Sequence, residues 1–186
     1  MHPVILSGLL NSKTVDRILD LQKTDLWFQG RVMGGLRGES IVNIKQRVVD
    51  NITVDILKNP WLPELLFDIV KTLDHDYDIR EVNQCELLKY GIGGKYDFHQ
   101  DVIWNKRNQP QRKLTIIVQL SDGSDYEEGD IVVKGYNFPK NFRERGTVII
   151  FPSNMQHQVN PVKSGTRYSL VSWAVGPYNE AGPNWR

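Results

Sequence analysis

The first 80 residues show the hydrophobic periodicity of two helices separated by short strands. Apolar residues at Val15, Ile18 and Leu19 repeat with the helical period behind Asn11 or Ser12, either of which suits an N-cap. A second helix is predicted with Asn59 as its cap and Pro60 at its first position. Its apolar face consists of Leu62, Leu65, Leu66, Ile69, Val70 and Leu73. Strands are expected at Val4–Leu6 and within the β-rich run Ile41–Ile56, including Ile41–Ile44.

After residue 80 the pattern changes to short apolar runs separated by turn-forming clusters. The runs are Glu86–Tyr90, Leu114–Leu120, Ile131–Lys134, Thr147–Phe151 and Tyr168–Val175. Glycine, proline, serine and aspartate separate them, which is typical of an antiparallel sandwich or barrel. The fold class expected is therefore mainly β with N-terminal helices. No polar linker divides the chain, so we predict a single domain over 1–186, with 1–80 as a helical and β buttress and 84–175 as the β core.

Composition restricts the chemistry more than the fold. The 186 residues carry 23 Lys+Arg and 22 Asp+Glu, a net charge of +1, which disfavours a protein that mainly neutralises phosphates. The lone Cys85 excludes an intrachain disulfide, and we expect it to be a small buried apolar residue. No run approaches 18 apolar residues, and the N-terminus has no signal-peptide pattern, so a cytoplasmic protein without a membrane span is expected.

With four histidines and one cysteine, a metal site has to draw on histidine and carboxylate ligands. His99 and Asp101 form a His-x-Asp motif. On a strand, the side chains of residues i and i+2 point to the same face. His157 follows 58 residues later, after a Pro-Ser-Asn turn. Two histidines and one carboxylate are the ligands of non-haem Fe(II) oxygenases. A solvated strand-end histidine paired with a carboxylate is the competing interpretation.

Arg167 follows His157 by ten residues. If His157 ends one strand and Arg167 begins the next, a Lys163–Gly165 turn would bring the two strands side by side. An arginine on the inner face of a barrel needs an anionic partner, and a carboxylate co-substrate supplies one through a bidentate pair. An ion pair on the sheet surface is the alternative.

Four segments together resemble the Fe(II)- and 2-oxoglutarate-dependent dioxygenases, in particular the prolyl 4-hydroxylase-like branch of bacterial and phage type. They are the Tyr90–Asp101 run with its glycines and His-x-Asp, the strand from Lys113 followed by Tyr126–Ile131, Phe151-Pro152 before His157, and Val162–Trp173. Glu128 departs from the pattern, because it stands where the family commonly has the first of two glycines. The segment around Trp27 and Gly30–Val32 is also similar to bacterial and phage members.

The resemblance implies a double-stranded β-helix, that is, a jelly-roll or cupin-like core, buttressed by helices. It implies that His99, Asp101 and His157 hold Fe(II) and that Arg167 binds the distal carboxylate of 2-oxoglutarate. Tyr90 and Gln119, with Thr115 on the same strand face, are further candidates for co-substrate binding. Tyr96 and Trp173 are candidates for the substrate side of the site, with simple core packing as the alternative.

The function implied is hydroxylation of a prolyl residue in a peptide or protein, with O2 consumed and ascorbate as a possible reductant. Three alternatives stay open: a small-molecule or amino-acid hydroxylase, a nucleic-acid demethylase, which the charge disfavours, and a non-catalytic jelly-roll binding protein. The basic segment 106–113 is a solvated loop or a lid over the substrate. The protein would be located in the cytoplasm, or in the host cytoplasm if it is viral. The oligomeric state is not predicted.

Overall fold

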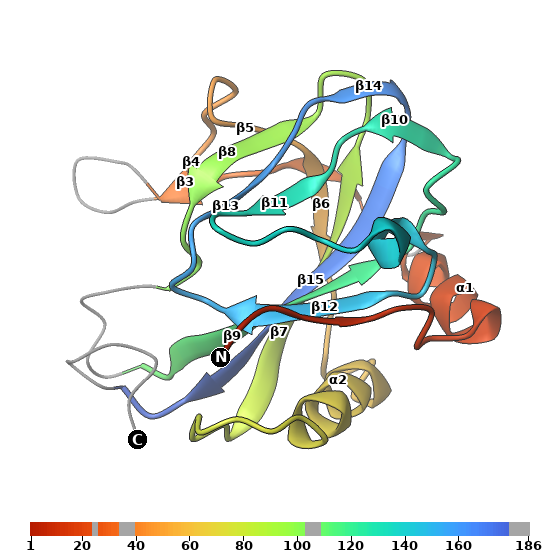
Figure 1. Cartoon of the computed structure of the whole chain (residues 1–186). Helices are drawn as coiled ribbons and strands as arrows, with labels where there is room; N and C mark the ends of the chain where they lie inside the picture. Colours follow the sequence, from red (N-terminus) through yellow and green to blue (C-terminus); the bar gives the residue numbers. More distant parts are fainter. Residues whose placement is uncertain (24–25, 34–39, 103–108, 179–186) are drawn as a thin grey trace.

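Two antiparallel sheets face each other and helices cover the outer face of the larger one (Figure 1). The computed structural model describes residues 1–23, 26–33, 40–102 and 109–178. In strand order, the seven-stranded sheet consists of β1 (Val4–Leu6), β12 (Val148–Pro152), β9 (Gln111–Gln119), β15 (Arg167–Gly176), β7 (Glu81–Tyr90), β6 (Asp50–Thr53) and β2 (Phe28–Gln29). The four-stranded sheet consists of β11 (Ile131–Val133), β13 (His157–Val159), β8 (Lys95–His99) and β5 (Arg47–Val48).

Two smaller pairs and the helices complete the fold. The pairs are β10 (Tyr126–Glu128) with β14 (Val162–Gly165), and β3 (Val32–Met33) with β4 (Ser40–Ile41). The helices are α1 (Ser12–Asp20) and α2 (Trp61–Lys71), with short 3-10 turns η1 (Leu21–Lys23) and η2 (Lys140–Arg143). The mainly β class and the double-stranded β-helix are thereby confirmed.

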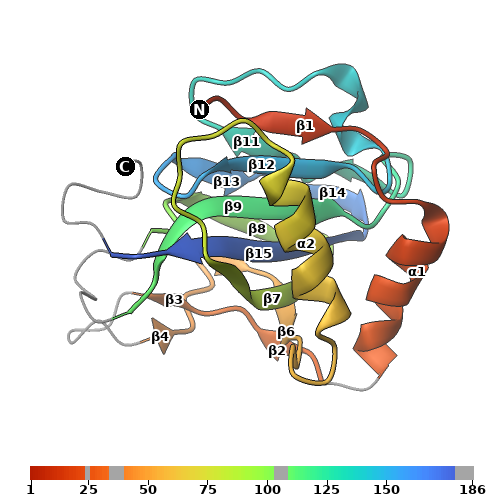
Figure 2. The ribbon, with the colours of Figure 1, turned by 90° about the horizontal axis from the view of Figure 1, so that it is seen from below.

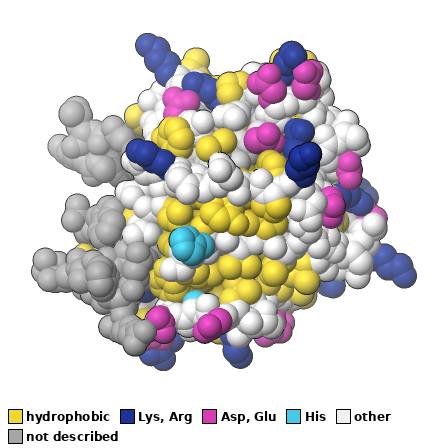
Figure 3. Space-filling view, in the orientation of Figure 1, with side chains coloured by type: hydrophobic (Ala, Val, Ile, Leu, Met, Phe, Trp, Pro, Cys, Tyr) yellow, Lys and Arg dark blue, Asp and Glu magenta, His cyan; other side chains and the backbone are white. Residues whose placement is uncertain are grey.

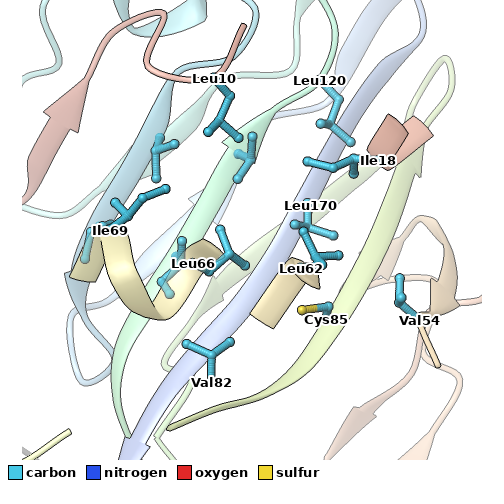
Figure 4. Packing of buried hydrophobic residues seen from close by; sticks show 14 of the residues in the cluster. Leu10, Ile18, Val54, Leu62, Leu66, Ile69, Val82, Cys85, Leu120 and Leu170 are labelled. Atoms are coloured by element: carbon cyan, nitrogen blue, oxygen red, sulfur yellow. The ribbon is translucent and has the colours of Figure 1, made fainter. Parts of the chain in front are cut away.

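The two helices pack on the outer face of the large sheet. Asn11 caps α1 through its side chain, which accepts a hydrogen bond of 3.0 Å from the Thr14 N–H, and Val15 and Ile18 are fully buried. Figure 2 shows α2 lying across the sheet, with α1 beside the end of it. A continuous apolar cluster joins both helices to the sheet; Figure 4 shows members including Leu62, Leu66, Cys85 and Leu170. Burial raises the pKa of the Cys85 thiol to about 11, so Cys85 is the inert core residue expected from the sequence.

Several element boundaries differ from those predicted. The predicted Asn59 cap of α2 is wrong: the N-cap is Pro60, which has no polar side chain for a cap bond. The Asn59 amide instead donates to the Asp55 carbonyl. Strand β4 ends at Ile41, so the predicted strand through Ile44 is wrong; Asn43 accepts hydrogen bonds from a turn there instead. Strand β9 begins at Gln111, three residues earlier than expected. Of the basic segment 106–113, predicted as a loop or lid, 106–108 lies outside the described residues, and 111–113 belong to β9 rather than to a loop.

The connection between His157 and Arg167 also differs from the expected turn. His157 begins β13 rather than ending a strand, and Val162–Gly165 forms β14, which pairs with β10. Strand β13 then belongs to the small sheet and β15 to the large one, so His157 and Arg167 face a common interior from opposite sheets. This crossing between sheets, not a hairpin, brings the two residues to one site.

The surface in the view of Figure 1 carries apolar side chains across its middle and charged side chains toward its rim, as Figure 3 shows. Positive and negative groups alternate along that rim, so the described part of this face presents no continuous basic surface. None of the described helices is long and apolar enough to cross a membrane.

Candidate active site

His99, Asp101 and His157 converge between the two sheets. His99 ends β8 and lies directly opposite His157 of β13 in the strand register, with the ring centroids 4.2 Å apart. The Asp101 carboxylate reaches both: its Oδ1 lies 3.6 Å from His99 Nε2, and its Oδ2 lies 3.5 Å from His157 Nε2. One donor atom from each residue lies within 4.8 Å of the others. Three donors at this spacing are close enough to share one ion.

Both imidazoles are oriented with Nε2 toward the shared point. His99 Nδ1 lies 2.8 Å from the Asp97 carbonyl and His157 Nδ1 lies 3.0 Å from the Met155 carbonyl. These carbonyls accept the Nδ1–H, which leaves the Nε2 lone pair for a metal. Burial, followed by the neighbouring His157, lowers the pKa of His99 to about 4, so its imidazole is neutral near pH 7. A neutral imidazole is the form that binds a metal ion.

Asp101 is positioned by hydrogen bonds rather than by the alternation of a strand. Strand β8 ends at His99, and the Asp101 N–H then donates to the Ser153 carbonyl at 2.9 Å. From the large sheet, the Thr115 hydroxyl donates to Asp101 Oδ2 at 2.8 Å and lies 3.1 Å from the Ser153 hydroxyl. Burial opposes ionisation of Asp101, but His157, His99 and Arg112 outweigh it and lower its pKa. The carboxylate is therefore held ionised.

Arg167 lies at the buried end of the same interior. It is 1% exposed at the start of β15, and one of its guanidinium NH2 groups donates to Gln119 Oε1 at 2.7 Å. Its guanidinium carbon lies 5.4 Å from the ring centroid of Tyr90, the residue directly opposite it in register. Among the described residues its Nε has no hydrogen-bond partner. A buried guanidinium with an unused donor fits a bound carboxylate.

A cavity of about 400 Å³ connects these groups. It is lined by the three candidate metal ligands and by Tyr90, Arg167, Tyr96 and Trp173. Burial keeps the Tyr90 phenol protonated by raising its pKa, so it is available as a donor. Tyr96 stacks on His99 with centroids 3.5 Å apart, and burial raises the pKa of Tyr96 to about 12. This volume is adequate for a small dicarboxylate and part of a second molecule.

Gln119 and Thr115 lie away from the cavity surface, although the sequence predicts both to bind the co-substrate. Gln119 is 1% exposed and contacts Arg167, and its Nε2 lies 3.4 Å from the Tyr126 hydroxyl. Thr115 is fully buried and contacts Asp101. In this structure Gln119 holds Arg167 in place and Thr115 holds Asp101 in place, so both are positioning residues.

Four charged residues of the cavity wall were not among the predicted site residues: Arg31, Arg47, Glu86 and Arg112. Arg112 illustrates the reason. Strict alternation along β9 places it with Leu114 on the helix-facing side, yet its guanidinium carbon lies 3.5 Å from the Trp173 ring centroid. The register between β9 and β15 shifts at Ala174/Val175, and such an irregularity re-aims side chains. The period-two pattern carries no signal of that shift.

Fold and site together define a jelly-roll protein with the ligand set of the two-histidine, one-carboxylate iron oxygenases. Comparison with known proteins agrees. A protein-family model described as "2OG-Fe(II) oxygenase superfamily" matches residues 85–175. A PKHD-type hydroxylase of Pseudomonas fluorescens is 30% identical over 176 residues, covering 89% of this chain and 75% of that protein. The chain therefore belongs to the 2OG-Fe(II) oxygenase superfamily and has PKHD-type hydroxylases among its relatives.

Solved structures show the same fold. A prolyl-4-hydroxylase of Pseudomonas putida aligns with a TM-score of 0.63 at 16% identity, covering 94% of this chain and 92% of that one. A prolyl hydroxylase of Trichoplax adhaerens, in complex with a hypoxia inducible factor peptide fragment, aligns with a TM-score of 0.67 at 16% identity, covering 93% and 83%. The chain spans about half the length of several other PKHD-type hydroxylases that it matches. Membership of the superfamily implies Fe(II) and 2-oxoglutarate as cofactor and co-substrate.

Proposed function

We propose that this protein hydroxylates a prolyl residue of a peptide or protein, using O2 and 2-oxoglutarate at an Fe(II) site. The observation that carries the proposal is the shared cavity: the His99–Asp101–His157 cluster and Arg167, whose Nε has no partner among the described residues, line the same space. When bound, Fe(II) and 2-oxoglutarate would supply the electrons that activate O2, the oxidant, for hydroxylation of a C–H bond. Ascorbate is the expected reductant for keeping the iron ferrous.

The residues of the chain then divide the work of binding and orientation. His99, Asp101 and His157 would hold the iron, with the Nδ1 contacts to carbonyls and the Thr115 hydroxyl fixing their directions. Arg167 would bind the distal carboxylate of 2-oxoglutarate, with the Tyr90 hydroxyl as a second donor. Gln119 would hold Arg167 in the direction required.

The substrate side is proposed for the Tyr96 and Trp173 walls. Both aromatic rings line the cavity, with Tyr96 stacked on His99 and Trp173 directly opposite Thr115 in register. Flat apolar walls beside the metal exclude water and suit a prolyl ring. The prolyl hydroxylase names of the structural neighbours support this substrate class. Superfamily membership favours an enzyme over the non-catalytic binding protein. The expected cytoplasmic location is likewise a proposal, consistent with a buried unpaired Cys85.

The test is release of succinate from 2-oxoglutarate by the purified protein with Fe(II) and ascorbate. A slow release without substrate is expected, stimulated by proline-containing peptides and accompanied by a 16 Da gain in peptide mass. Arg167→Lys should raise the 2-oxoglutarate KM by about 10²-fold, because a single ammonium replaces a two-point contact. Arg145→Lys, on the exposed Asp16 pair, is the matched control and should leave that KM unchanged.

Free amino acids and methylated oligonucleotides belong in the same screen. Stimulation by either of them, with no response to peptides, would replace the prolyl substrate with one of the alternative classes. A protein that binds neither iron nor 2-oxoglutarate would refute the proposal altogether.

A further inference from the structure

The cavity holds more positive charge than the proposed co-substrate needs. Among the residues that the structure describes, four arginines and two carboxylates, Glu86 and Asp101, line its wall. Under the proposed function Arg167 is taken by 2-oxoglutarate and Asp101 by the metal. Arg47 and Arg112 then share the described part of the cavity wall with one remaining carboxylate, that of Glu86. Concentrated positive charge in a partly enclosed site attracts an anion.

Arg47 is held at the wall by a backbone carbonyl, an aromatic ring and one long ion pair with Glu86. One of its guanidinium nitrogens donates to the Arg31 carbonyl at 2.7 Å, and its guanidinium carbon lies 4.7 Å from the Tyr96 ring centroid. The nearest carboxylate oxygen, of Glu86, lies 3.7 Å away, and Glu86 itself accepts a shorter bond of 2.6 Å from the Gln84 amide. The Arg47 side chain is 11% exposed, and its Nε has no partner in the described part of the chain. Leaving a buried charged donor unpaired is unfavourable, so this group favours an incoming acceptor.

Gly30 gives this guanidinium its room. A Cβ at Gly30 would lie 2.8 Å from Arg47 Nε and 2.6 Å from Val49 Cγ1, closer than real Cβ atoms approach. The Gly30 N–H also donates to the carbonyl of Val49, the residue between β5 and β6, at 2.7 Å, which fixes the backbone of Gly30 beside Arg47. The position of Arg47 is therefore built into the packing of the wall.

Arg112 comes to the same cavity from the large sheet. Its guanidinium contacts neutral acceptors, Gln84 Oε1 at 3.1 Å and the Asp101 carbonyl at 3.5 Å, and stacks on Trp173. Arg47 is linked to His99 through Tyr96, and Arg112 is linked to Asp101 directly. The two guanidinium groups thus flank the substrate side of the metal site, whereas Arg167 is at its buried end.

We propose that Arg47 and Arg112 form a second anion subsite that binds a carboxylate of the substrate within about one residue of the prolyl ring. The inference rests on the proposed function and specifies its substrate class. The carboxylate comes either from an acidic side chain next to the target proline or from the free α-carboxylate of a terminal or isolated proline. A planar guanidinium on an aromatic ring is suited to bidentate carboxylate binding.

Binding without turnover tests the subsite, with Mn(II) in place of iron and 2-oxoglutarate present. Titration calorimetry measures the affinity of acetyl-Ala-Pro-Glu-Ala-amide and of the same peptide with glutamine in place of glutamate. A second pair compares acetyl-Ala-Pro with a free C-terminal carboxylate and its C-terminal amide. Free proline is a third acidic ligand. At least one acidic ligand should bind about 10-fold more tightly than its neutral partner. Arg47→Gln should reduce that preference to less than about 3-fold and leave 2-oxoglutarate affinity unchanged. Added salt should lower the binding affinity of the acidic ligands and leave that of the neutral ligands unchanged.

Arg80→Gln is the matched control, since Arg80 is exposed and paired with Asp78. It should keep the full preference, and Arg47→Lys should keep part of it. If the protein binds 2-oxoglutarate and releases succinate but binds acidic and neutral ligands equally, or binds no acidic ligand, the subsite is refuted and the proposed function stands. If a methylated oligonucleotide displaces the acidic ligands more strongly than any peptide does, the subsite serves phosphate and the inference is wrong. Failure to bind 2-oxoglutarate refutes the proposed function instead.

Discussion

The two faces of β9 and β15 use the same backbone for opposite purposes. Toward the helices, the residues of β9 are Leu114, Ile116 and Val118, all fully buried in the apolar cluster of Figure 4. Toward the small sheet the same strand presents Thr115, Ile117 and Gln119. On β15, Leu170 and Ala174 face the helices, whereas Arg167 and Trp173 line the cavity.

The difference shows how a small protein keeps a polar site stable. The helix-facing side needs only apolar shape, since burial there contributes about 25 cal/mol per Å² and tolerates similar volumes. On the cavity side every buried polar group needs a specific partner, and Thr115 with Asp101 and Gln119 with Arg167 provide such partners. Substitutions at adjacent positions of one strand should therefore have different effects: loss of stability on the helix-facing side, and loss of metal or co-substrate binding on the cavity side.

The largest effect is expected at Asp101. Asp101→Ala removes the anionic ligand between the two histidines, and succinate release should fall by at least about 10³-fold while the fold persists. Asp97→Ala, on an exposed pair with Lys95, is the control and should retain activity. Activity retained within 10-fold in Asp101→Ala would remove Asp101 from the metal site.

On the helix-facing side, Ile116→Ala should cost stability rather than chemistry. Ile116 is fully buried in the cluster under the helices, so the free energy of unfolding should fall by about 2–5 kcal/mol. Denaturant titration measures this, and the 2-oxoglutarate KM of the folded fraction should stay the same. A changed KM with unchanged stability would contradict the division between the two faces.

Its neighbour Thr115 should behave in the opposite way. Thr115→Val keeps the volume but loses the donor to Asp101 Oδ2, and metal affinity should fall about 10- to 100-fold. Titration with Mn(II) measures the affinity, and Thr115→Ser, which keeps a hydroxyl, should recover most of it. Equal affinity for the metal in Thr115→Val would show that the hydroxyl does not orient the carboxylate.

Acid should destabilise the metal-free protein through His99. Its pKa is about 4 when folded, mainly because of burial, against an ordinary value of about 6.5. Between these values the unfolded chain binds more protons, so stability is present above pH 6.5 and is lost as the pH falls toward 4, by up to about 1.4 kcal/mol per pH unit. Chelator-treated protein unfolded across this range should show the slope, and His99→Gln should flatten it. A flat profile in the unmodified protein would contradict this cause.

The smallest effect is a gain, at the position where the sequence departs from the family pattern. Glu128 has a φ of +61°, in the left-handed region where glycine is favoured, and its carbonyl accepts from Arg143 at 2.8 Å. Glu128→Gly should therefore stabilise by up to about 1 kcal/mol, seen as a Tm increase of about 2–4 °C. Glu128→Ala keeps the strain and should give no comparable gain. A lower Tm for Glu128→Gly would show that the glutamate side chain contributes more than the backbone strain costs.

Local pattern and spacing account for the parts of the site that depend on neighbours in sequence. The β-rich half, helix α1 with Asn11 as one of two candidate caps, the buried Cys85 and the His-x-Asp with its distal His were all available from the sequence. The start of α2 was less accessible: the Asn59 amide donates to the Asp55 carbonyl, and the helix begins after Pro60. The direction of Arg112 depends on a shift in the register between β9 and β15, which the period-two pattern does not encode.

The sequence by itself determined which residue types are present for an iron and 2-oxoglutarate site, because ligand chemistry and strand alternation are local properties. Only the tertiary structure decided their partners. Thr115 contacts Asp101, Gln119 contacts Arg167 and three further arginines line the cavity. These contacts form because strands far apart in the sequence pair within the large sheet, and because the two sheets face each other. Long-range packing sets those distances, and at these distances a buried charge is either satisfied or left ready for a ligand.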